Sequence, residues 1–146
     1  MNFNIHGGHS LKCRGASGLL DEVNEDRAVK NKVIALLRNE GHTVYDCTDD
    51  NGKDQNSNLK AIVSKCNDHK VDLDVSIHLN AGGGTGTEVY IYSDNSKSKD
   101  EAERIAKNIS NTLGIRNRGV KVSKNLYVLR KTNSPALLIE CCFVDN

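Results

Sequence analysis

Residues 71–81 constrain the fold more than any other part of the chain. Val71, Leu73, Val75, Ile77 and Leu79 fall on one side of an extended strand, and Asp72, Asp74, Ser76, His78 and Asn80 fall on the other. This alternation predicts a half-buried strand, which the glycines at positions 82–84 end. His78 therefore lies at the carboxyl end of a core strand, with its imidazole away from the main apolar face. In open α/β sheets, ligands bind at that end of the strands.

The rest of the chain alternates between strand and helix patterns. Strands are predicted over residues 3–5, 43–47, 71–80, 87–92, 126–129 and 135–140, helices over 21–40, 57–67 and 99–113, and a basic turn over 116–120. The run that ends at Glu140 is continuously apolar, as in a strand buried on both faces. Such alternation is typical of α/β proteins.

The expected helix ends have recognisable capping residues. Asp21 is expected to cap the first helix, Ser57 the second, and Gly114 to end the third. Gly41 is expected to stop the first helix. The expected buried face of that helix consists of Ala28, Val29, Val33, Leu36 and Leu37.

Composition excludes several classes of protein. A length of 146 residues suits one domain, and a net charge of +1 gives no electrostatic reason to expect nucleic acid or an anionic membrane as partner. No apolar run is long enough to span a membrane, and the first residues do not form a signal peptide. The five cysteines include no CxxC pair, so neither a disulfide framework nor a cysteine-based zinc site is expected.

Four polar side chains stand at the ends of predicted elements: His9, Glu22, His78 and Glu140. Two imidazoles, one carboxylate and an open position would make a catalytic zinc site, and a second carboxylate nearby would act as general base. No GxSxG motif, phosphate loop or dinucleotide fingerprint competes with this interpretation.

Three alternatives remain open from the residues alone. Glu25 lies one helical turn after Glu22, and both suit the positive end of a helix dipole. The glycine-rich loop holds a second histidine, His6. Glu140 is either an active-site carboxylate or the partner of a cation such as Arg130.

The chain resembles the zinc-dependent N-acetylmuramoyl-L-alanine amidases of the Amidase_3 type, found in bacterial autolysins and phage endolysins. The segments that are similar are Gly8-His9, GASGLLDE at 15–22, SIHLNA at 76–81, GTEVY at 86–90, NRGV at 117–120, YVLR at 127–130 and PALLIE at 135–140. They occur in the family's order over almost the whole chain. The combination of SIHxNA with PAxLxE is specific to the family.

The resemblance implies a site and a reaction. One Zn²⁺ per chain would be held by His9, Glu22 and His78, and Glu140 would be the catalytic residue. Glu22 is preferred to Glu25 because its distance from Gly41 suits the family pattern. His6 would lie near the metal without binding it. The substrate would be bacterial peptidoglycan, cut at the amide between N-acetylmuramic acid and L-alanine. Asn80 and Arg130, together with Arg118, are candidate substrate contacts.

The implied fold is a twisted, mostly parallel sheet of about six strands with helices on both faces, of the phosphorylase/hydrolase-like kind, in a single domain. Two departures accompany the resemblance. Cys142 replaces a glycine of the family's ExGFxSN segment, and the chain ends at Asn146, where the family continues into a further helix and often a wall-binding domain. The domain is therefore expected to lack both.

Two other classes of protein stay under consideration. One is a zinc carboxypeptidase or endopeptidase acting on stem peptides, which would need an arginine clamp near the metal. The other is an inactive wall-binding module. An origin like that of a phage endolysin, made in the cytoplasm and acting on the wall after release, is expected, with secretion by another route as the alternative.

Overall fold

The computed structural model describes all of residues 1–146, which form six strands and four helices. In chain order they are β1 (Asn2–Gly7), α1 (Glu22–Asn39), β2 (Thr43–Asp46), α2 (Gln55–Asn67), β3 (Leu73–Asn80), β4 (Thr87–Ile91), α3 (Lys99–Leu113), β5 (Asn117–Val122), α4 (Tyr127–Lys131) and β6 (Ala136–Phe143). None of the four helices has the length and hydropathy needed to cross a bilayer.

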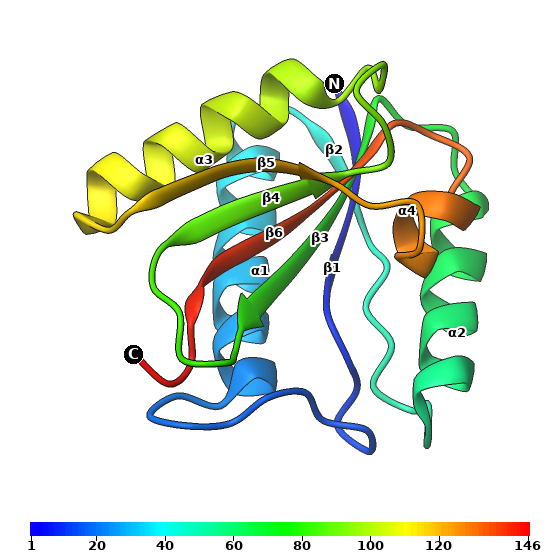
Figure 1. Cartoon of the computed structure of the whole chain (residues 1–146). Helices are drawn as coiled ribbons and strands as arrows, with labels where there is room; N and C mark the ends of the chain where they lie inside the picture. The colour runs from blue at the N-terminus through cyan, green and yellow to red at the C-terminus, as the bar shows by residue number, and fades with distance from the viewer.

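The strands form one sheet in the order β2-β1-β3-β6-β4-β5. Neighbouring strands are parallel except β4 and β6, which run antiparallel. Helices α1 and α3 pack on one face, and α2 and α4 on the other (Figure 1). The predicted fold class, a mostly parallel six-stranded sheet between helices, is confirmed.

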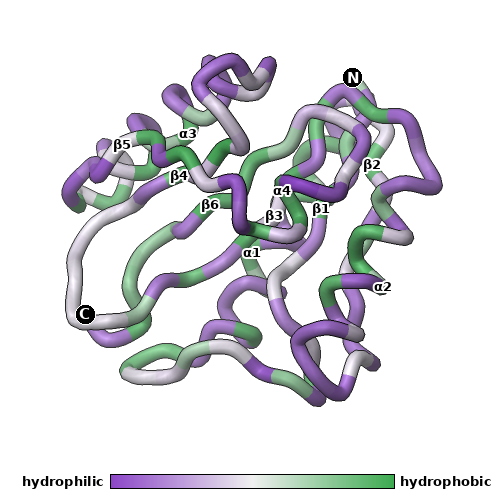
Figure 2. Tube along the Cα trace, turned by 45° about the vertical axis from the view of Figure 1, so that its right-hand side comes forward, coloured by the Kyte–Doolittle hydropathy of each residue, from purple (hydrophilic) through white to green (hydrophobic).

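The central strand β3 is buried on both faces, whereas the alternation predicted burial on one. Val75 and Ile77 belong to the larger core with α1 and α3, and Asp74 and Ser76 are buried on the opposite face. Helix α2 covers that second face. Asn4 on β1 makes the burial of Asp74 tolerable because its Nδ2 donates to Asp74 Oδ1 at 2.7 Å. Along α2 and α3 the tube in Figure 2 alternates between hydrophilic and hydrophobic, as amphipathic helices do.

Helix ends agree with the sequence at three of the four predicted positions, because α1 also ends just before Gly41, which has a φ of 91°. The Asp21 side chain accepts from Asn24 N at the start of α1, and Gly114 ends α3 with a left-handed φ of 65°. Helix α2 begins earlier than predicted, because Asp54 is its N-cap and Ser57 is the reciprocal partner in a capping box.

Two predictions near the C-terminus are wrong. Residues 117–122 form the edge strand β5 rather than a turn, and Gly119, with φ of 83°, lies where the pairing of β5 with β4 shifts register. Residues 127–131 form helix α4 rather than a strand. Val128 and Leu129 are consecutive and both buried against α2, which a helical turn allows but an alternating strand does not.

The buried face of α1 also differs from the prediction. The helix buries Val23, Asp26, Lys30 and Ile34. Val29 and Leu36 are exposed, while Val29, Val33 and Leu37 line an apolar groove of about 550 Å³ between α1 and α3. The apolar residues of α1 therefore cover a wider arc than the sheet can bury.

Candidate metal centre and active site

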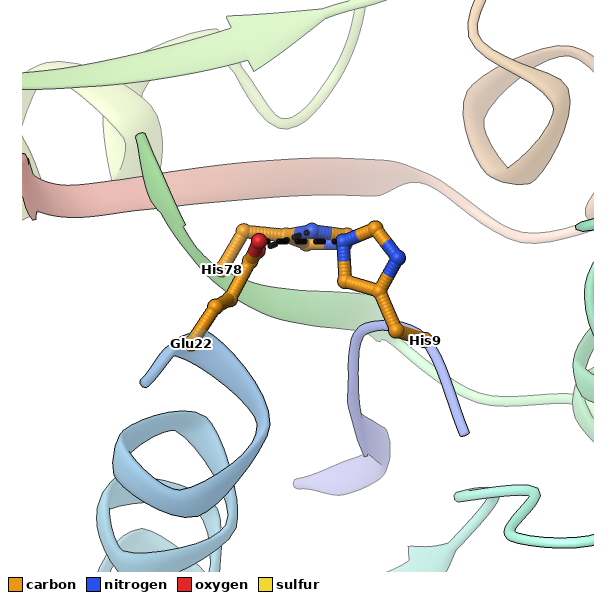
Figure 3. A group of neighbouring side chains, drawn as sticks. All are labelled: His9, Glu22 and His78. Carbon is orange, nitrogen blue, oxygen red and sulfur yellow. Dashed lines mark hydrogen bonds and ion pairs between the residues drawn. The ribbon is translucent and has the colours of Figure 1, made fainter. Parts of the chain in front are cut away.

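Three side chains from distant parts of the chain converge beyond the carboxyl ends of β1 and β3. His9 follows β1, Glu22 is the first residue of α1, and His78 lies near the end of β3. His9 Nε2 is 3.2 Å from Glu22 Oε1, and His78 Nδ1 is 3.1 Å from Glu22 Oε2. Figure 3 shows the two imidazoles and the carboxylate pointing toward one another. Their donor atoms all lie within 4.8 Å of one another, so this group can hold a metal ion.

A sharp backbone turn at Gly8 and His9 places the His9 side chain next to Glu22 and His78. A side chain at Gly8 would collide with the ring of His78, which explains a glycine at that position. His9 itself has φ of 63° and is the one non-glycine residue in the left-handed region. Such a conformation costs on the order of 1–3 kcal/mol and persists where the surroundings enforce it.

Glu22 is fixed by four contacts. Besides the two histidines, its Oε1 accepts from Ala16 N at 3.0 Å and its Oε2 accepts from Leu79 N at 3.1 Å. Burial alone would raise the pKa of Glu22, but the hydrogen bonds and charges of His78 and His9 outweigh it and hold that pKa far below its usual range. The carboxylate is therefore ionised and oriented, as a metal ligand must be.

His78 is oriented from its other side. Its Nε2 lies 2.9 Å from Ser76 Oγ, which leaves Nδ1 facing Glu22. Burial lowers the pKa of His78, whereas the hydrogen bond to Glu22 raises that of His9. A partner on the second ring nitrogen is the usual device that fixes the orientation of a metal-binding histidine.

Glu140 stands next to this group on β6, where it pairs in register with His78. Its Oε2 is buried without a hydrogen-bond partner. Burial, assisted by the charges of Glu22 and Glu88, raises the pKa of Glu140 to about 8. The alternative in which Arg130 pairs with Glu140 is wrong, because the guanidinium of Arg130 lies over the ring of Tyr127, 5.6 Å from its centroid.

The remaining candidates occupy different places. Glu25 is half-buried and lies outside the His9–Glu22–His78 group. His6 is buried, its ring nitrogens have no partner, and burial together with the charges of His78 and Arg27 lowers its pKa to about 3. Arg130 does not line the cleft described below.

The side chain of Glu88 fixes that of Asn80. Glu88 belongs to the GTEVY segment, but the sequence alone gave it no role. Asn80 Nδ2 donates to Glu88 Oε1 at 2.9 Å, and Asn80 Oδ1 accepts from Ala81 N. Glu88 also accepts from Arg118 Nε at 2.9 Å and from the Tyr90 hydroxyl at 3.1 Å. The sequence does show that Glu88 and Tyr90, two residues apart in one strand, lie on the same face of the sheet. That spacing could have indicated their contact.

The group opens into a cleft of about 480 Å³. Its floor includes His78 and Glu140, and its walls come from α2 and from the segment that leads into α4, with Asn58, Leu59 and Tyr127 among the lining residues. No lysine or arginine lines it. A His/Glu/His group with an unpaired carboxyl beside it, at the end of a mostly parallel sheet, is the arrangement of a metal-dependent hydrolase.

Comparison with known proteins identifies the family. Residues 4–146 match the Amidase_3 model, described as N-acetylmuramoyl-L-alanine amidase, and the chain belongs to that family. The catalytic domain of an endolysin targeting Clostridia difficile superimposes with a TM-score of 0.91 at 31% identity, over 100% of this chain and 83% of that one. The catalytic domain of CwlV, an N-acetylmuramoyl-L-alanine amidase from Bacillus (Paenibacillus) polymyxa, gives 0.82 at 28% identity, over 100% and 83%.

A curated relative is considerably longer than this chain. An uncharacterized protein of Clostridium perfringens (strain 13 / Type A) is 39% identical over 150 residues, which cover 99% of this chain. The chain spans 44% of the length of that relative.

Proposed function

We propose that this chain hydrolyses the amide bond between N-acetylmuramic acid and the L-alanine of the stem peptide in bacterial peptidoglycan, using one zinc ion bound by His9, Glu22 and His78, with Glu140 as general base. The observation that carries the proposal is the position of Glu140. Its Oε2 is buried without a hydrogen-bond partner on the strand next to His78, in a chain that belongs to a family of such amidases.

The donor set fits zinc. Two imidazole nitrogens and one carboxylate oxygen are the ligands of many catalytic zinc sites, and these three residues line the cleft, from which water and substrate would reach the ion. Glu22 is ionised and the ring of His78 is oriented by Ser76 before any metal binds. When bound, zinc supplies Lewis-acid polarisation of a carbonyl and lowers the pKa of coordinated water.

Glu140 would move the proton. Its carboxylate accepts a proton from the attacking water and then delivers it to the nitrogen of the leaving L-alanine, so the carboxylate is regenerated. In the metal-free chain burial raises the pKa of Glu140 to about 8, so its carboxyl is largely protonated at neutral pH. A nearby cation favours its ionised form, which the reaction requires.

Other residues would position the substrate. Asn80 lines the cleft and has its amide fixed by Glu88 and Ala81, so it offers a rigid edge to a bound peptide. Arg118 is fixed by Glu88 as well. Arg130 would contact only the part of a stem peptide that extends beyond the cleft.

The two alternatives have less support. A carboxypeptidase would recognise a terminal carboxylate with a cation in the cleft, and no arginine or lysine lines it. A wall-binding module gains nothing from a carboxyl oxygen that is buried without a partner, as Glu140 Oε2 is, because ionisation of that carboxyl costs stability.

The test is digestion of purified cell walls by the chain with zinc, with a chelator, and with the variants Glu140→Gln and Glu140→Ala. We expect loss of turbidity that depends on zinc, new L-alanine amino termini, no new reducing sugars, and a decrease of about 10²–10⁴-fold in rate for Glu140→Gln. New termini other than L-alanine would assign a peptidase instead. Zinc binding without any cleavage would refute the catalytic role.

A further inference from the structure

The guanidinium of Arg27 hydrogen-bonds to the backbone of the loop that bears His9. Arg27 Nη1 donates to the carbonyl oxygen of Gly8 at 2.8 Å, and Nη2 donates to the carbonyl oxygen of His9 at 2.8 Å. Two consecutive carbonyls are thus held by one planar group. Because the two donors of a guanidinium have a fixed spacing, this contact sets the orientation of both peptide units.

Arg27 is itself held in place by acidic side chains. Nη1 also donates to Asp26 Oδ1 at 2.6 Å, and Nη2 donates to Asp50 Oδ1 at 2.8 Å. The Arg27 side chain is 13% exposed and that of Asp26 is fully buried. A guanidinium that is mostly shielded from solvent and paired with two carboxyl groups has little freedom to move, so the carbonyls it holds have little freedom as well.

Arg27 bonds the carbonyl of His9, which is the residue with the strained backbone. His9 is the non-glycine residue with positive φ, and its carbonyl accepts a second bond from Asn58 Nδ2 at 3.2 Å. Left-handed backbone at a histidine persists only when surrounding contacts enforce it. Arg27 and Asn58 are the side chains that bond the carbonyl of His9.

Helix α1 carries both Arg27 and the candidate ligand Glu22. Glu22 begins the helix and Arg27 lies five residues further along it. One rigid element therefore supplies one candidate ligand and fixes the backbone of another. His78 needs no such device because β3 and Ser76 already orient it.

We propose that Arg27 is a positioning residue for the metal centre, which holds the backbone of His9 in its left-handed conformation so that the imidazole faces Glu22 and His78 before metal binds. The inference rests on the proposed function, in which His9 is a metal ligand. Arg27 does not touch the metal or the substrate in this role.

Arg38 provides a matched control on the same helix. Its Nη2 donates to the carbonyl oxygen of Val44 at 2.6 Å, far along α1 from the metal centre. Arg38→Gln thus removes an arginine–carbonyl bond without affecting the loop of His9. Arg27→Lys is the conservative variant, since an ammonium retains the charge but cannot hold two carbonyls in one plane.

The experiment measures the zinc dissociation constant of the whole chain by competition with a chromophoric chelator, together with the visible spectrum of the Co²⁺ form and the free energy of unfolding of the metal-free chain. We expect Arg27→Gln to weaken zinc binding by about 10–100-fold, the range for groups that orient metal ligands. Arg27→Lys should recover part of the loss. Arg38→Gln should stay within about twofold of the wild type, as for a distant site.

A double-mutant cycle with His9→Ala separates positioning from general support of the fold. If Arg27 acts through His9, Arg27→Gln changes zinc affinity in the wild type and has no further effect in the His9→Ala background. Equal losses in both backgrounds, or an unchanged affinity and Co²⁺ spectrum in Arg27→Gln, would overturn the inference and leave the proposed function intact. A wild-type chain that binds no zinc would overturn both.

Discussion

Each oxygen of Glu22 serves two partners, one histidine and one backbone N–H. That arrangement distinguishes Glu22 from Glu25, which the sequence alone left as an alternative. The first residue of α1 lies beside the loop before the helix, where Ala16 is. Glu25 lies one turn further along the helix axis, by about 4.5 Å, and makes none of these contacts.

The first prediction concerns this pair of glutamates. Glu22→Gln should weaken zinc binding by at least about 100-fold, since even groups that only orient ligands cost 10–100-fold. Glu25→Gln is the matched control on the same helix and should bind zinc like the wild type. Equilibrium dialysis against buffered zinc measures both. A larger loss in Glu25→Gln than in Glu22→Gln would exchange their assignments.

The second prediction concerns the buried carboxyl of Asp74. Burial raises the pKa of Asp74 to about 6 from 3.8, against the opposing hydrogen bonds of Asn4 and Cys66. The folded chain therefore binds this proton more tightly than the unfolded chain, so Asp74 destabilises the fold increasingly as pH rises from about 4 to about 7. Asp74→Asn cannot ionise, and its stability relative to wild type should improve over that range by at most about 3 kcal/mol.

Urea unfolding of the metal-free chain at several pH values measures this difference. Asp72→Asn, an exposed neighbour, gives the background. A stability difference between Asp74→Asn and wild type that does not change with pH would show that Asp74 ionises as easily in the folded chain as in the unfolded one.

The family resemblance and the strand and helix pattern identified the candidate site residues at the ends of elements. They did not identify the residues whose hydrogen bonds hold those residues in place. His9 follows a predicted strand, Glu22 lies at the start of a predicted helix, and His78 and Glu140 lie near or at the ends of predicted strands. Arg27 was not singled out, because only the folded loop shows which carbonyls its guanidinium reaches. The same holds for Glu88, whose partners Asn80 and Arg118 come from two other strands.

At the scale of elements, long periodic segments were predictable and short ones were not. Helix α3 begins and ends where the sequence predicts, because its apolar residues recur at helical spacing and Gly114 ends it. The five residues of α4 include Tyr127 and Val128, which favour strands in general. Burial of Val128 and Leu129 against α2 decides in favour of a helix, and that contact is tertiary.

The third prediction tests the end of α3. Gly114 has φ of 65°, and nothing lies within 4 Å of the place where a Cβ would be. Gly114→Ala should thus be destabilised for conformational reasons alone, by about 1–2 kcal/mol. Gly114→Asn should lose less, since asparagine tolerates this region better. Denaturant unfolding measures both, and zinc affinity should not change. Equal stability of Gly114→Ala and wild type would refute a left-handed C-cap.

At the scale of the whole molecule, the parallel order of β1, β3 and β6 assembles the site. The carboxyl ends of these three strands meet at one edge of the sheet, so residues separated by up to 131 positions, His9 and Glu140, reach the same cleft. Helix α1 crosses one face and presents its first residue at that edge. A metal ion bound there would add a connection among three elements that hydrogen bonds already join.

The fourth prediction follows from that connection. A ligand that binds only the folded chain stabilises it by RT ln(1 + [L]/Kd), so free zinc at 100 times its Kd should add about 2.7 kcal/mol and raise the melting temperature by about 5–10 °C. Thermal unfolding across a series of buffered zinc concentrations measures the rise. Glu140→Gln should retain it, because Glu140 is not proposed as a ligand, whereas His78→Ala should lose most of it. If His78→Ala kept the full zinc-dependent rise, the ion would be bound elsewhere in the chain, and the contact between His78 and Glu22 would serve the fold rather than a metal.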